Sequence, residues 1–75
     1  MNTTQTSRAA TAEAVRASMA RTNTSITDAA SALGVSRATL SRKANGHSAF
    51  KSEELSALAT IMGIRPADLL GADAA

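Results

Sequence analysis

Three cationic side chains stand close together in the middle of this sequence, in the stretch "SRATLSRKANG" of residues 36–46. They are Arg37, Arg42 and Lys43, and no acidic residue lies among them. An arginine guanidinium presents a planar fork of donors that pairs with a phosphate or with two acceptors at once, and a lysine ammonium supplies a compact positive charge. These residue types predict a site for an anionic partner.

The charge of the chain is small but unevenly distributed. The formal net charge is +2, yet residues 36–51 carry four cations and no acid, a balance of +4. Residues 52–75 carry one cation and four acids, a balance of −3. The sequence therefore predicts a positive pole in the middle of the chain.

The composition excludes several classes of protein. The 75 residues include no cysteine and a single histidine, so we expect no disulfide, no metal site and no cofactor. No histidine is paired with a carboxylate and no phosphate-binding loop is present, so we expect no enzyme. No apolar run approaches the roughly 20 residues that span a membrane. We expect a soluble, cytoplasmic protein.

Alanine-rich composition and helical spacing of apolar residues predict an all-α fold of five helices. Residues 1–10 are polar and lack an apolar period, so they are expected to form a flexible arm. A compact domain over residues 11–71 and a disordered tail over 72–75 follow. The expected helices are Thr11 to Thr22, Ser25 to Gly34, Ser36 to Ala44, Ser52 to Gly63, and a short one that Pro66 opens, with Leu69 and Leu70 on the core.

The spacing of Ala30, Gly34 and Leu40 predicts a helix-turn-helix over residues 25–45. The small Ala30 lets two helices approach, Gly34 makes the turn between them, and Leu40 packs back on the first helix. The outward face of the second helix of this unit then carries Arg37, Ala38, Ser41 and Arg42. A helix that presents such residues at its N-terminal end fits the major groove of B-DNA.

The segment from Ser25 to Leu70 resembles the lambda-repressor/Cro-type helix-turn-helix domain. The resemblance is carried by "ALGVSRATLSR", by the "NG" that closes the third helix and by "ELSALATIMGIRPADLL". The chain also resembles the small helix-turn-helix repressors of actinobacterial phages. The resemblance implies binding to double-stranded DNA.

The resemblance also implies a role for individual positions. The residues implied to face bases are Arg37, Ala38, Ser41 and Arg42. The residues implied to contact the DNA backbone are Ser25, Ser36, Thr39, Asn45, the Gly46 amide and, from the arm, Arg8; Ser36 and Thr39 could instead meet thymine methyl groups. Lys43 and Lys51 are expected to contact phosphate because they are cations beside this face.

Two positions depart from the family pattern. Many relatives carry glutamine where this chain has Ile26, and a large apolar residue where it has Lys43. We expect Phe50 to fill the apolar space and to leave Lys43 free for phosphate.

The function that these expectations favour is a sequence-specific transcriptional regulator, a temperate-phage immunity repressor that acts by covering its operator, as a monomer or a weak homodimer. A Cro-like phage regulator is the first alternative. A protein-interaction module with the same fold, an antirepressor or an antitoxin, is the alternative from another class. A non-specific architectural DNA protein is disfavoured, because it needs more charge than +2.

Overall fold

The structure of the protein is a computed structural model that describes the backbone of residues 3–70 and the side chains of residues 8–70. The described elements are α1 (Thr3–Arg21), α2 (Ile26–Leu33), α3 (Arg37–Ala44), α4 (Ser52–Met62) and the 3₁₀ turn η1 (Pro66–Leu69). The all-α expectation is confirmed for this part of the chain, with four α-helices instead of five. Pro66 opens a single 3₁₀ turn of four residues, which is too short to be a fifth α-helix.

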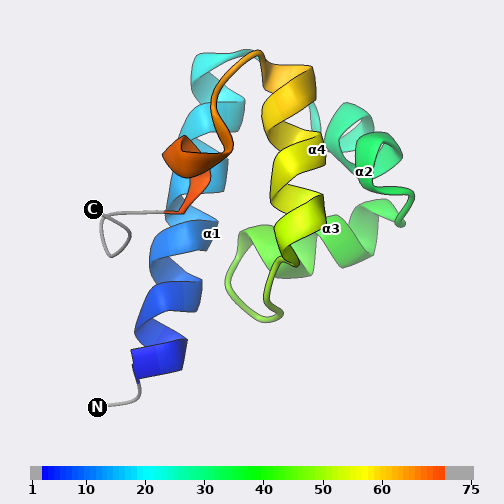
Figure 1. The fold of residues 1–75 in the computed structure, drawn as a ribbon. Helices are drawn as coiled ribbons and strands as arrows, with labels where there is room; N and C mark the ends of the chain where they lie inside the picture. The colour runs from blue at the N-terminus through cyan, green and yellow to red at the C-terminus, as the bar shows by residue number, and fades with distance from the viewer. Residues whose placement is uncertain (1–2, 71–75) are drawn as a thin grey trace.

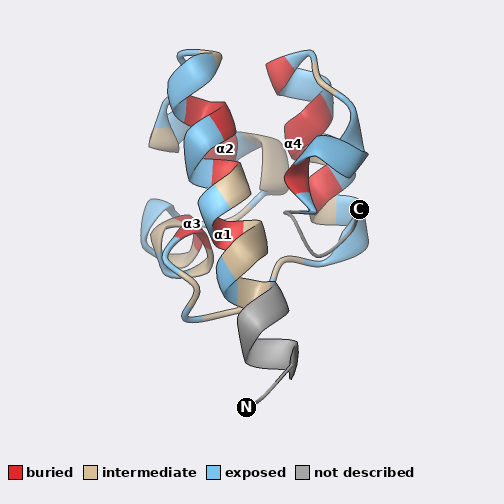
Figure 2. Cartoon of the chain, turned by 90° about the vertical axis from the view of Figure 1, so that its left-hand side faces the viewer, coloured by how far each residue is buried: buried red, intermediate tan, exposed pale blue. Residues whose placement is uncertain are grey.

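The helices assemble around one apolar core. In Figure 1, α1 and α4 stand upright, η1 lies against both, and α3 crosses near their lower part. The helix α2 packs on α3 and α4, and α3 also packs on α1. Figure 2 shows buried stretches alternating with exposed ones along the helices, as amphipathic faces require. The buried core consists of Val15, Met19, Ala29, Ala30, Leu40, Leu55, Leu58, Ala59, Met62 and Leu69.

All four α-helices end in the same hydrogen-bonded turn, in which one residue adopts a left-handed conformation. After α2 this residue is Gly34, with φ of 68°. Its N–H donates to the Ser31 carbonyl at 3.1 Å, and the next N–H, of Val35, donates to the Ala30 carbonyl at 3.0 Å. Because left-handed backbone is strained for residues with a Cβ, glycine is the residue expected here. The corresponding residues after α1, α3 and α4 are Asn23, Gly46 and Gly63.

The N-terminal arm is the largest error of the sequence-based prediction. The helix α1 begins at Thr3, so residues 3–10 are helical, whereas the sequence predicted a flexible arm and a helix start at Thr11. A Cβ placed on Gly46 would lie 3.9 Å from the Ala12 Cβ and 4.0 Å from the Ala9 Cα, so this part of α1 rests on the turn after α3. This packing and the helix propensity of Ala9 and Ala10 favour a helix that starts before Thr11.

Smaller differences concern the C-terminal half. Leu69 is fully buried as expected, but Leu70 is 42% exposed, so the prediction that it packs in the core was wrong. The N-cap of α4 is Lys51 and not Ser52, which is the first helical residue. Residues 1 and 2 and the predicted tail over residues 72–75 lie outside the described residues.

Candidate nucleic-acid interface

The helix α3 is fixed in orientation by its two ends and its buried face. Ser36 caps it, since its Oγ accepts the Thr39 N–H at 3.0 Å and its hydroxyl bonds to the Thr39 Oγ1 at 3.0 Å. Leu40 is fully buried and Ala44 is 4% exposed. The face opposite these two residues therefore points out of the molecule.

The outward face of α3 carries the residues that the sequence predicted to face bases. Arg37, Ala38 and Arg42 are exposed, and Ser41 is half-buried. Among the described residues, neither of these two arginines has an ion-pair or hydrogen-bond partner for its guanidinium. Both guanidinium forks are available to a partner.

The serine before each helix of the turn unit is an N-cap. Ser25 accepts the Asp28 N–H on its Oγ at 3.0 Å, as Ser36 does for Thr39. Both serines are exposed and Thr39 is half-buried. The N-terminal amides of α2 and α3, which have no partner within the helix, lie beside these hydroxyl groups, and such amides favour anions.

The turn after α3 uses most of its own donors. The Gly46 N–H donates to the Lys43 carbonyl at 3.1 Å, so the amide predicted to anchor phosphate is engaged within the turn. The side-chain amide of Asn45 folds back and donates to the Ser41 carbonyl at 2.8 Å. The same Nδ2 also donates to the Ser41 Oγ at 3.3 Å, so the amide predicted to contact phosphate is directed back onto α3, although Asn45 is exposed.

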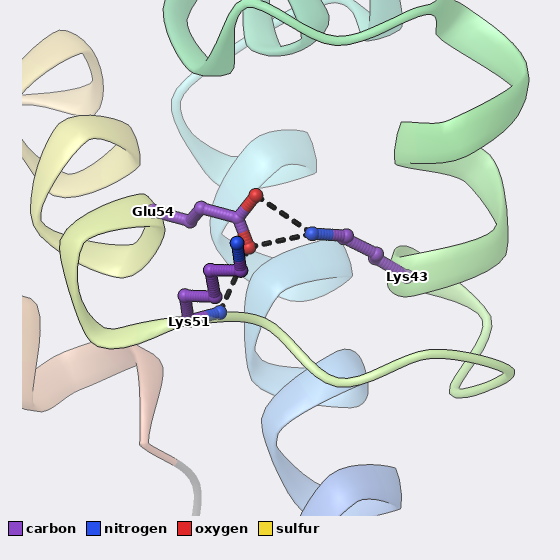
Figure 3. Close-up of polar contacts among 3 residues, drawn as sticks. All are labelled: Lys43, Lys51 and Glu54. Atoms are coloured by element: carbon purple, nitrogen blue, oxygen red, sulfur yellow. Dashed lines mark hydrogen bonds and ion pairs between the residues drawn. The ribbon is translucent and has the colours of Figure 1, made fainter.

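Lys43 is not the free cation that the sequence predicted. Its Nζ lies 2.6 Å from both carboxylate oxygens of Glu54, and each of the two side chains is only 12% exposed. Figure 3 shows the pair bridging the space between α3 and the start of α4. Phe50 packs against the core, as predicted, without releasing Lys43. Lys51 is exposed.

Arg8 lies on α1, not on a flexible arm. It is half-buried, and its Nε is a buried atom for which the described residues provide no hydrogen-bond partner. It lines a groove of about 270 Å³ together with Phe50, Leu55 and Leu70. The structure therefore places Arg8 against the body of the domain.

Sequence reasoning missed two residues that hold the end of α3. Arg16, which is exposed on α1, donates from Nη1 to the carbonyl of Ala44. Glu54, in the first turn of α4, binds Lys43 in the last turn of α3. The C-terminal end of a helix attracts cations, but Arg16 is 28 residues from Ala44 along the chain, so no local sequence signal indicates this contact.

The fold changes the charge balance that the sequence suggested. The acid-free run of residues 36–51 folds against Glu54, which neutralises Lys43. Three cations of that run, Arg37, Arg42 and Lys51, stay exposed. In the part of the chain that the structure describes, no three His, Cys, Asp or Glu side chains gather as a metal site would require.

A capped helix with a buried inner face and a cationic outer face, set against a second helix by a tight glycine turn, defines a helix-turn-helix domain of DNA-binding proteins. A protein-family comparison agrees, since a family described as helix-turn-helix matches residues 15–69. The chain belongs to this family and is a DNA-binding transcription regulator in the general sense. No match was found among curated proteins or among solved structures. None of the helices described between residues 3 and 70 is both long and apolar enough to cross a bilayer.

Proposed function

We propose that this protein is a sequence-specific regulator of transcription that binds double-stranded DNA through α3. The observation that carries this proposal is the outward face of α3, where exposed Arg37 and Arg42 have no partner among the described residues. Arginine is the side chain that most often reads guanine in the major groove, through two parallel hydrogen bonds.

Phosphate groups of the DNA would be bound at both ends of this helix. The N-terminal ends of α2 and α3 offer amides that have no partner within the helix, together with the hydroxyl groups of Ser25 and Ser36, and these groups suit phosphates flanking the groove. Lys51 adds an exposed cation beyond the end of α3. Phosphate contacts supply salt-dependent affinity, and the arginines supply the choice of sequence.

The biological role we propose is immunity repression in a temperate phage: the bound domain covers an operator inside a bacterial host cell and blocks polymerase. Support for this role is the resemblance of residues 25–70 to small phage repressors. The same fold supports a Cro-like regulator, which differs in the promoter it controls. No catalytic step and no cofactor is part of the proposal.

The experiment that tests sequence reading is selection of bound duplexes from a random pool at a recorded salt concentration. We expect an enriched motif, because the arginines discriminate between bases. Its symmetry then gives the stoichiometry, since two inverted half-sites indicate a dimer and one asymmetric site a monomer. A pool without enrichment at any salt concentration would contradict the proposal and favour a protein partner.

The role in immunity is tested separately in cells. We expect expression of the protein to silence a reporter whose promoter overlaps the selected motif, and to protect the host from a phage that carries the motif. Activation of the reporter, or silencing without protection, would reject immunity repression while leaving DNA binding in place.

A further inference from the structure

One carboxylate, that of Glu54, joins three segments of the chain. Both of its oxygens lie 2.6 Å from the Nζ of Lys43, in the last turn of α3. Its Oε1 also accepts the backbone N–H of Lys51 at 2.8 Å, where the loop enters α4. Glu54 itself is in the first turn of α4. Figure 3 shows Lys43 and the backbone of Lys51 meeting at this one group.

The ion pair is shielded from water and remains charged at neutral pH. Each side chain is only 12% exposed. Burial by itself raises the pKa of Glu54, but the hydrogen bonds from Lys43 and the Lys51 backbone, with the charges of both lysines, hold it below its ordinary value of 4.5. Bonds between a buried ammonium and a carboxylate are short, strong and directional, so the pair fixes a geometry.

The position of this pair in α3 matters for the outward face. The helix packs on α2 and α1, and its N-terminal end follows the Gly34 turn. Its last turn is held from outside by Arg16, which donates to the Ala44 carbonyl, and by Glu54, which binds Lys43. Arg42 precedes Lys43 in that same turn. A shift of the turn therefore shifts the Arg42 guanidinium.

We propose that Glu54 is a positioning residue for sequence reading: by holding Lys43 it sets the last turn of α3, and thereby the direction of Arg42, without touching DNA. This inference rests on the proposed function above. Lys43 is in this view a structural partner of Glu54 and makes no contact with phosphate.

The competing role for Lys43, a direct phosphate contact, makes opposite predictions. Loss of Glu54 would then release an ammonium next to DNA and strengthen binding to every duplex. Loss of Lys43 would weaken binding to every duplex and reduce the salt slope by about 0.9, the value for one phosphate contact. A positioning role instead changes the discrimination between sequences.

The test compares Glu54→Gln and Lys43→Met with Glu53→Gln as the matched control. Glu53 is exposed in the same first turn of α4, and its change removes the same charge without touching Lys43. Glutamine at position 54 can still accept the Lys51 N–H, so the start of α4 keeps its cap. Dissociation constants are measured for the selected duplex and an unrelated duplex over a range of salt concentrations, with folding checked by circular dichroism.

We expect the ratio of selected to unrelated affinity to fall about fivefold or more in Glu54→Gln and in Lys43→Met, the scale of coupling through a packed network. The ratio for Glu53→Gln stays within about twofold of the wild type, and the salt slope of Lys43→Met stays unchanged. If Glu54→Gln does not fold, Glu54→Asp replaces it, because aspartate keeps the charge but is too short to reach Lys43.

Two results would overturn the inference. If the wild type discriminates between the duplexes and the folded position-54 variant keeps the same ratio of selected to unrelated affinity, Glu54 has no positioning role, while the proposed function stands. If Lys43→Met weakens binding to both duplexes alike and reduces the salt slope, Lys43 contacts phosphate, and the positioning role is rejected as well. A wild type that does not discriminate overturns the proposed function as well, so the two failures are distinguishable.

Discussion

Replacement of Arg42 by alanine isolates the chemistry of the proposed interface. Arg42 is exposed, and within the described residues its guanidinium has no partner, so its removal leaves no buried group unsatisfied. We expect the free energy of unfolding to change by no more than about 0.5 kcal/mol. Affinity for the selected duplex should fall by about 1–3 kcal/mol, which is about 5- to 150-fold.

The salt dependence shows which kind of contact was lost. If Arg42 binds a base edge, Arg42→Ala weakens the selected duplex much more than an unrelated duplex and leaves the salt slope nearly constant. If it binds phosphate, both duplexes weaken alike and the slope falls by about 0.9. Fluorescence anisotropy titrations with both duplexes at several salt concentrations measure these quantities.

A matched arginine elsewhere provides the control. Arg65 is 84% exposed, and it precedes η1, which packs on α1 and α4. Its ion pair with Asp68, at 3.6 Å on the surface, contributes at most about 1 kcal/mol. Arg65→Ala should therefore change DNA affinity less than about threefold. Full affinity in folded Arg42→Ala and Arg37→Ala proteins would refute the assignment of α3 as the recognition helix.

Three further predictions concern the scaffold of the site. Leu40→Ala empties a fully buried position and should cost about 2–5 kcal/mol, lowering the thermal midpoint by at least about 8 °C; a smaller loss would mean that Leu40 does not hold α3 to the core. Gly34→Ala places a Cβ where no atom lies within 4 Å, so only the strain of φ at 68° remains, and urea unfolding should show a loss of about 1–2 kcal/mol; no loss would contradict the left-handed turn. Because folding lowers the pKa of Glu54, the stabilising contribution of its carboxylate is complete above pH 4.5 and disappears as the pH falls through the pKa of the folded state. The difference in unfolding free energy between wild type and Glu54→Gln should therefore approach zero on acidification. A difference that stays constant with pH would show that the carboxylate is not paired.

The N-caps of α2 and α3, the end of α2 and the buried face of α3 were predictable because the signals for them are local. Ser25 and Ser36 cap helices through amides three residues ahead, and Gly34 ends α2 through bonds within the preceding turn. These contacts lie within a few residues, so residue type and spacing suffice to predict them. The apolar period placed Leu40 inside, and with it Arg37 and Arg42 outside.

The state of the remaining cations was decided only by the tertiary structure. Lys43 and Glu54 are 11 residues apart and Arg16 and Ala44 are 28 apart, and each pair meets because of how α3 packs against its neighbours. The helical residues of α1 before Thr11 were likewise not predictable from an apolar period, and Ala9 and Ala12 pack against the turn at Gly46 only in the folded chain. A sequence determines which charged side chains need an ion-pair or hydrogen-bond partner when they are removed from water. The arrangement of the helices determines which partner each of them obtains.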